Sequence, residues 1–390
     1  MDPLEALAGD LRERLLAGAG DGEEDLPGRI RSLVEREAGV LSEARRGELA
    51  ARIAQRAFGL GALEPLLADP AVDEVMVCGT APVWVERGGR LECTGVRFER
   101  EADLRDAIER ILAPLGRRAD ESEPLADARL PDGSRVNVVL PPLALDGPAL
   151  TIRRFRRHGL APDELVANGT LGRGLLDFLA RAVRARASVL VCGGTGSGKT
   201  TTLNVLSSFV GESERVVTIE DAAELRLRQP HVVRLEARPP NLEGRGEVTI
   251  RRLVRNALRM RPDRIIVGEV RGPEALDLLT ALSTGHDGSL STVHAGSPVE
   301  ALRRIEVLAL MADVGLPHAA IREQIADAFD LVVCQARLPN GARRIVSVAE
   351  VVRVASGPAA RELYTWRDEA PRWRAALTDG LAARLEAAGD

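Results

Sequence analysis

The chain contains a glycine-rich segment whose residue types and spacing are those of a phosphate-binding loop. It reads Gly193-Gly194-Thr195-Gly196-Ser197-Gly198-Lys199-Thr200, the pattern G-x-x-x-x-G-K-T. An apolar run at 188–192 precedes it and an expected helix at 201–206 follows it, which is the context that the motif requires. Backbone N–H groups in such a turn point at phosphate oxygens. We expect the residues from Gly193 to Thr201 to bind ATP, with Lys199 at the β- and γ-phosphates and the Thr200 hydroxyl on Mg²⁺.

Two acidic residues, Glu220 and Asp221, directly follow the apolar run 216–219. Carboxylates at the C-terminal edge of a parallel sheet face the nucleotide crevice, where they can hold Mg²⁺ or orient an attacking water. We predict a catalytic role for Glu220 and a metal-binding role for Asp221. The alternative is that these residues begin a helix, since acidic side chains are favoured in a first helical turn. For Glu224, three residues further on, the two interpretations are equal.

A third strand-like run, 264–267, is similar to the strand that carries a Mg²⁺-binding aspartate in phosphate-loop enzymes, but Gly268 stands at the aspartate position. Glu269 follows it and is the natural group to polarise water for attack on the γ-phosphorus, so we predict that it is catalytic. Without the aspartate, metal coordination by the protein is expected from Thr200, with water-mediated help from Glu220 or Asp221. A purely structural Glu269 is disfavoured, because burying a carboxylate without a partner is costly.

Two of the five histidines, His286 and His294, lie in the segment 283–295 around a further strand-like run. Their spacing of eight residues differs from that of zinc motifs such as H-E-x-x-H, and no cysteine is near in sequence. We predict that His294 senses the γ-phosphate. For His286, satisfying buried hydrogen bonds is an equal alternative.

The elements that must position these residues alternate between strand and helix. Apolar runs at 188–192, 216–219, 264–267 and 288–293 each precede an expected helix. The pattern predicts an α/β domain over 166–355, with a mostly parallel sheet and helices on both faces. We expect a small α+β domain over 61–158 with two hairpins, a helical region over 1–60, a linker at 159–165 and a C-terminal tail at 356–390.

Composition places the chain among ordinary globular proteins. Its 390 residues are 45% hydrophobic and 28% charged, and the net charge of −5 argues against a dedicated nucleic-acid coat protein. No apolar stretch approaches the roughly 18–20 residues that span a bilayer, and the N-terminus does not look like a leader peptide, so we expect a cytoplasmic location. The four cysteines are scattered, which disfavours a zinc site or a disulfide framework.

Four blocks occur in order along the chain, at 193–200, 218–225, 265–272 and 283–295. Together they closely resemble the Walker A motif, Asp box, atypical Walker B motif and His box of the secretion-superfamily traffic ATPases, which power type II and type IV secretion and type IV pilus assembly. Segments 63–70, 131–137 and 150–155 extend the resemblance, which spans residues 60–350 and looks like the Tad (Flp) pilus assembly branch.

This resemblance implies a homo-hexameric ring of RecA-like motor domains, each preceded by a domain that supplies arginines over the nucleotide. Arg135, Arg153 and Arg154 match the positions of those arginines. It also implies attachment to the inner face of the membrane through platform proteins. The chain lacks the tetracysteine zinc module of the extension-type pilus and type II secretion ATPases. We therefore expect no zinc. With the charge nearly balanced, we also expect no direct contact with nucleic acid.

The leading function is a Mg²⁺-dependent ATPase that powers assembly of a Tad-type pilus or a related secretion machine. One alternative is a type IV secretion ATPase that moves DNA or effector proteins. Another is a nucleotide-gated scaffold with little turnover, against which the presence of Lys199 and Glu269 argues. A small-molecule phosphate-loop kinase would leave the histidine segment unexplained.

Overall fold

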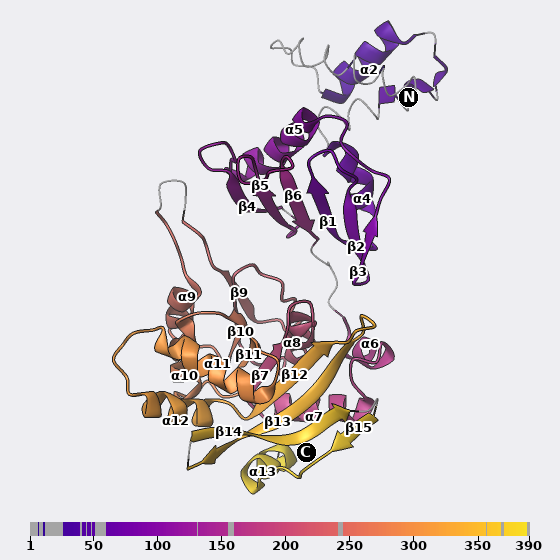
Figure 1. Cartoon of the computed structure of the whole chain (residues 1–390). Helices are drawn as coiled ribbons and strands as arrows, with labels where there is room; N and C mark the ends of the chain where they lie inside the picture. Colours follow the sequence, from indigo (N-terminus) through magenta and orange to yellow (C-terminus); the bar gives the residue numbers. More distant parts are fainter. Residues whose placement is uncertain are drawn as a thin grey trace. The chain divides into compact units, whose positions relative to one another are not determined.

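The computed structural model describes residues 60–387 apart from 131, 155–159, 241–244, 356 and 368–369. Among the first 59 residues it describes 7, 11, 26–39, 41–43, 45–47 and 49–50. The chain divides into two compact units, Met1–Arg156 and Arg157–Asp390 (Figure 1). Each unit has its own sheet and its own hydrophobic core.

The first unit contains a six-stranded antiparallel sheet with the strand order β3-β2-β1-β6-β5-β4. Buried side chains alternate with more exposed ones along β5 and β6, and the apolar face of the sheet packs on α5 and on Leu63 and Leu66 of η1 and α4. Both expected hairpins are present, β2–β3 and β4–β5. The elements are η1 (Gly61–Leu63), α4 (Glu64–Ala68), β1 (Val72–Cys78), β2 (Trp84–Arg87), β3 (Arg90–Cys93), α5 (Glu101–Leu112), η2 (Ala113–Leu115), β4 (Leu125–Arg129), β5 (Arg135–Val139) and β6 (Ala149–Arg153).

Helix α2 (Leu26–Glu37) lies in the expected helical region 1–60. It buries Ile30, Leu33 and Val34, which form a small core with Leu11 and Leu49. Most of the rest of that region lies outside the described residues.

The second unit contains a nine-stranded sheet with the order β15-β14-β13-β12-β7-β11-β10-β8-β9. The strands from β12 to β9 pair in parallel, whereas β13, β14 and β15 add an antiparallel extension. The strands are β7 (Val189–Gly193), β8 (Val216–Glu220), β9 (Val232–Glu236), β10 (Arg264–Val270), β11 (Leu290–His294), β12 (Leu331–Arg337), β13 (Arg343–Val354), β14 (Gly357–Arg367) and β15 (Ala370–Trp373).

Helices cover both faces of this sheet, because its central strands are apolar on both sides. All five positions of β7 are buried, as expected for a parallel strand inside a layered α/β fold. Helices α9 (Ile250–Ala257), α10 (Glu274–Leu282), α11 (Pro298–Leu310) and α12 (His318–Ala328) pack on one core. A second core is formed with α6 (Pro162–Ala167), α7 (Arg173–Arg184), α8 (Lys199–Ser207) and α13 (Asp379–Ala387). The predicted α/β architecture is confirmed.

The second unit extends past the expected motor-domain boundaries at both ends. Helix α6 begins at Pro162, inside the segment 159–165 expected to be a linker. The described part of the expected tail, 356–390, forms β14, β15 and α13. These elements belong to the unit because β14 pairs along β13, and because Leu381 and Leu385 of α13 are buried in the core. None of the described helices has the length and apolar character needed to cross a membrane.

Candidate nucleotide-binding site

The phosphate-loop segment joins β7 to α8 and has the backbone of an anion-binding turn. Gly196 and Gly198 have φ values of +67° and +96°, a left-handed region that side chains with a Cβ rarely adopt. Within the turn, the carbonyl oxygen of Gly194 accepts hydrogen bonds from the Ser197 hydroxyl at 2.9 Å and from Lys199 Nζ at 3.1 Å. The lysine ammonium therefore lies over the loop, where phosphate oxygens would meet it.

Glu269 lies in the same site as Lys199. Its Oε1 is 4.0 Å from Lys199 Nζ, and its Oε2 accepts a hydrogen bond from Arg271 Nε at 2.8 Å. Arg271 also reaches Asp221, with Nη1 at 3.4 Å from Oδ2. Burial lowers the pKa of Lys199, and the charge of Glu269 partly offsets this effect. The fold thus brings the predicted cation and carboxylates together from three separate segments of the chain.

Two of the expected oxygen ligands are placed where Mg²⁺ could be held. Thr200 is the second residue of α8, and the Asp221 side chain, 46% exposed, follows the end of β8. Hydroxyl and carboxylate oxygens are ligands that Mg²⁺ accepts, together with waters and substrate phosphates. Within the described ranges, no group of three His, Cys, Asp or Glu side chains forms a metal cage. This donor set suits a cation shared with a nucleotide.

Glu220, predicted to be catalytic, has a different environment in the structure. It is 3% exposed, and its carboxylate accepts hydrogen bonds from the backbone N–H groups of Glu224, at 2.8 Å, and Leu225, at 3.0 Å. Burial raises the pKa of its carboxyl, against the effect of those two donors. The side chain therefore fixes the turn after β8, which carries Asp221, and its predicted catalytic role stays a prediction.

The position of Glu220 also explains the glycine at 268. A Cβ added to Gly268 would lie 2.8 Å from Cγ of Glu220, closer than real Cβ contacts. On the other side, the carbonyl oxygen of Gly268 accepts a hydrogen bond from the Thr292 hydroxyl at 2.5 Å. An aspartate at 268 has no room, because a carboxylate from the neighbouring strand β8 occupies that space.

The two histidines of segment 283–295 occupy different places. His294 is the last residue of β11, is exposed, and pairs in register with Gly193, the last residue of β7. It thus stands at the edge of the sheet from which the phosphate loop begins. His286 Nδ1 lies 3.1 Å from the carbonyl oxygen of Ala281, within hydrogen-bonding distance. This contact is of the kind expected under the alternative that His286 satisfies hydrogen bonds within the fold.

The three predicted arginines lie in the first unit at the end of its sheet. Arg135 of β5 and Arg153 of β6 are cross-strand partners, so their side chains lie on the same face of the sheet. Arg154 lies just beyond β6, and its guanidinium donates to the backbone carbonyls of Asp69 and Val72. This contact anchors Arg154 within the first unit, and its predicted role over nucleotide stays a prediction.

Three residues at the site were not predicted from the sequence. Gln335 and Arg343, from β12 and β13, contact the loop, and Arg271 pairs with Glu269. Arg271 belongs to the block 265–272 and could have been singled out there. Gln335 and Arg343 lie more than 130 residues after the loop, and only the pairing of β12 with β7 brings them near it.

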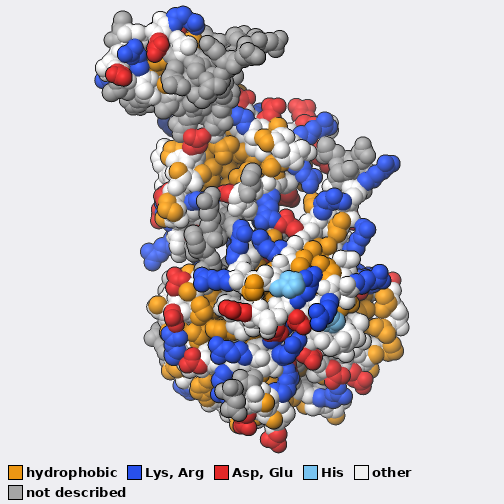
Figure 2. Space-filling model, turned by 180° about the vertical axis from the view of Figure 1, so that it is seen from behind, with side chains coloured by type: hydrophobic (Ala, Val, Ile, Leu, Met, Phe, Trp, Pro, Cys, Tyr) orange, Lys and Arg blue, Asp and Glu red, His pale blue; other side chains and the backbone are white. Residues whose placement is uncertain are grey.

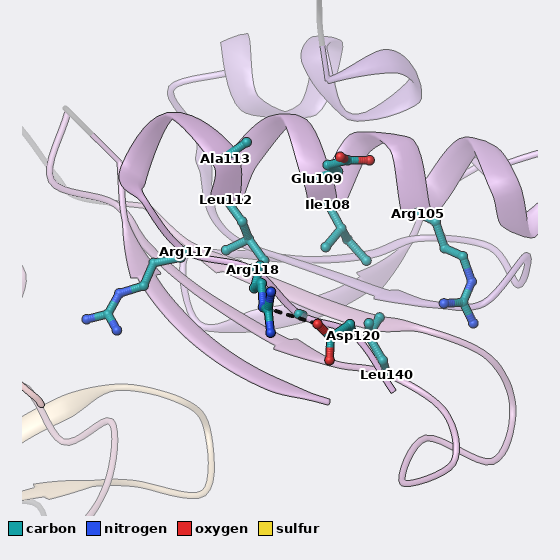
Figure 3. Close-up of a pocket in the computed structure, with 10 residues that line it drawn as sticks. Arg105, Ile108, Glu109, Leu112, Ala113, Arg117, Arg118, Asp120 and Leu140 are labelled. Atoms are coloured by element: carbon teal, nitrogen blue, oxygen red, sulfur yellow. Dashed lines mark ion pairs between the residues drawn. The ribbon is translucent and has the colours of Figure 1, made fainter. Parts of the chain in front are cut away.

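A cavity of about 320 Å³ lies in the first unit, along α5 and the segment that follows it (Figure 3). Its lining combines apolar side chains of α5 with charged groups, among them an ion pair of Arg118 with Asp120 at 3.1 Å. None of the residues predicted for the nucleotide site lines it.

Comparisons with known proteins identify a family and several relatives that are similar to this chain. The sequence profile of the family described as Type II/IV secretion system protein matches residues 56–359. A provisionally named conjugal transfer protein of Mycobacterium tuberculosis is 44% identical over 305 residues, which cover 77% of this chain and 86% of that protein. The type IV secretion system protein PtlH of Bordetella pertussis is 38% identical over 319 residues, covering 74% and 93%. The Legionella pneumophila ATPase DotB shares the fold, with a TM-score of 0.54 and 22% identity over 76% of this chain and 80% of that one.

Proposed function

The chain belongs to the type II/IV secretion system protein family and is a phosphate-loop ATPase, and on that premise we propose that it powers a type IV secretion or conjugal transfer machine. The observation that carries this choice is the set of relatives: those at 44% and 38% identity are named for conjugal transfer and for type IV secretion. They favour the alternative of a type IV secretion ATPase over Tad pilus assembly, the branch that the sequence motifs resemble.

We propose that each residue of the site has a separate role in ATP hydrolysis. Lys199 neutralises charge on the β- and γ-phosphates, and the N–H groups of the loop bind the same oxygens. Glu269, held between Lys199 and Arg271, orients the attacking water and accepts its proton. His294, at the end of β11, is the candidate sensor of the γ-phosphate.

Mg²⁺ fits the oxygen donors of the site and would be held by Thr200, with Asp221 acting directly or through water. When bound, the cation would neutralise charge on the β- and γ-phosphates. Arg271 lies beside both Asp221 and Glu269, so it keeps these two carboxylates close to each other before nucleotide enters.

The proposal includes a homo-hexamer in which Arg135 and Arg153 reach a nucleotide. Arg135 and Arg153 are cross-strand partners on one face of the sheet, with Glu74 as the partner of Arg153 on β1. Guanidinium groups suit the γ-phosphate because they bind its oxygens in a planar fork. We further propose that the ring works in the cytoplasm, at the inner face of the membrane, through platform proteins. Acidic and basic side chains are interspersed over the second unit on the face in Figure 2.

The test combines Glu269→Gln with measurements in solution and in cells. We expect ATP to bind with wild-type affinity, while single-turnover hydrolysis falls by at least about 100-fold, because the water loses its base. In cells that carry the gene, transfer of DNA or protein should stop. Glu323→Gln, an exposed residue of α12, is the matched control and should change neither activity.

Two results would contradict the proposal in different ways. Lost ATP affinity with unchanged chemistry would make Glu269 a binding residue. Loss of surface filaments with normal transfer of DNA and protein would assign the enzyme to pilus assembly instead.

A further inference from the structure

The hairpin formed by β12 and β13 packs directly on the phosphate loop. Gln335 of β12 is 2% exposed, and its Oε1 accepts a hydrogen bond from the Thr202 hydroxyl of α8 at 2.7 Å. Arg343, the first residue of β13, donates from Nε to the carbonyl oxygen of Gly196 at 3.1 Å. The hairpin therefore holds both the loop and the helix that follows it.

Two glycines of the loop lie very close to this hairpin. A Cβ on Gly193 would lie 2.3 Å from the carbonyl oxygen of Gln335. A Cβ on Gly198 would lie 3.0 Å from Gln335 Nε2 and 3.2 Å from Arg343 Cδ. The contact with the hairpin thus requires glycine at 193, whereas at 198 the approaching atoms belong to side chains and the positive φ is what favours glycine.

The bond from Arg343 determines which way one peptide unit of the loop points. In a planar trans peptide, the carbonyl and the following N–H point in opposite directions. Because Arg343 holds the Gly196 carbonyl outward, the N–H of Ser197 points into the loop, where it donates to the Gly194 carbonyl oxygen at 3.4 Å. Lys199 Nζ and the Ser197 hydroxyl donate to that same carbonyl oxygen, so these hydrogen-bond donors of the loop converge at one point.

We infer that Arg343 is a positioning residue of the nucleotide site, which acts by holding the Ser197 N–H inward for a phosphate oxygen. The β12–β13 hairpin is then a working part of the phosphate-binding machinery. The inference rests on the nucleotide site described above and adds to it a side chain that lies outside all four sequence motifs. It also predicts that Arg343 acts on binding more than on chemistry, since its bond is to the backbone of the loop.

The experiment compares the full-length wild type with Arg343→Ala, Arg343→Lys and the control Arg353→Ala. Arg353 lies on the same strand, where it pairs with Asp327 at the surface. The readouts are the Kd of a fluorescent ATP analogue, kcat and KM for ATP, the Tm, and hydrogen exchange of the peptide that contains Ser197.

We expect Arg343→Ala to raise Kd and KM by about 10-fold, as for loss of one hydrogen bond from a charged donor, with kcat and Tm close to wild type. Exchange at the loop should accelerate. Arg343→Lys should restore only part of the affinity, because a flexible ammonium cannot replace the directed Nε–H donor. Arg353→Ala should bind as the wild type does.

Wild-type affinity in Arg343→Ala would overturn the inference while leaving the nucleotide site intact. A Tm that falls together with Kd and kcat would overturn it too, since the arginine would then stabilise the fold generally. Complete rescue by Arg343→Lys would replace the directional bond with a simple charge effect and so contradict it. Failure of the wild type to bind the analogue would overturn both this inference and the ATPase site.

Discussion

Replacing Gly268 with alanine tests whether Glu220 excludes any side chain from the position where phosphate-loop enzymes usually carry a metal-binding aspartate. The new Cβ would lie 2.8 Å from Cγ of Glu220, against an ordinary carbon–carbon contact of about 3.5 Å or more. Glu220 cannot swing aside freely, because its carboxylate is held by the N–H groups of Glu224 and Leu225.

The magnitude follows from the overlap. Forcing one extra methyl group into a packed interior costs about 1–3 kcal/mol. For a domain the size of the second unit, each kcal/mol lowers Tm by about 2–4 °C, so the expected decrease is about 2–12 °C. Gly174→Ala is the control, since nothing lies within 4 Å of its added Cβ and its φ is not positive; its Tm should not fall.

A double-mutant cycle separates the overlap from other effects. In a Glu220→Ala background the clash is absent, so adding Gly268→Ala should cost far less than it does in the wild type. Thermal unfolding and urea titration of the four proteins give the coupling free energy. An equal cost of Gly268→Ala in both backgrounds would refute the reasoning, and so would a Gly268→Ala protein as stable as the wild type.

Three further predictions use the same protein. Lys199→Ala should abolish detectable ATP turnover, because the ammonium over the loop is lost; steady-state phosphate release measures this, and wild-type turnover would contradict the site. Burial raises the pKa of Glu220 above its ordinary value of 4.5. This group therefore contributes its full stabilisation of the fold below pH 4.5, and the contribution is lost as the pH rises through the folded-state pKa. Urea titrations should find that the free energy of unfolding falls over this pH range in the wild type and changes less in Glu220→Gln. Arg153→Ala should lower the rate of ATP hydrolysis by about 10-fold or more while Tm stays near that of the wild type. Arg154→Ala should instead lower Tm, because the hydrogen bonds of Arg154 to backbone carbonyls are lost. Equal hydrolysis rates in Arg153→Ala and the wild type would exclude a role of Arg153 at the nucleotide.

The sequence by itself determined the phosphate loop, the α/β alternation and the two hairpins of the first unit. Each depends on residues that are close along the chain: glycines that adopt a positive φ, apolar runs of strand length, and turn residues between them. For the same reason Lys199 and Glu269 could be singled out, since each is tied to the end of its own strand or turn.

The tertiary structure decided how separate segments share the site. Glu220 reads as a strand-end carboxylate in the sequence, but pairing of β8 with β10 places it against Gly268, where it anchors a turn. Arg343 carries no motif, and it reaches Gly196 only because β12 pairs with β7 and β13 with β12. The order of strands in a parallel sheet depends on contacts between residues far apart in sequence, because long crossover connections join the strands, and the pattern within one strand does not encode that order.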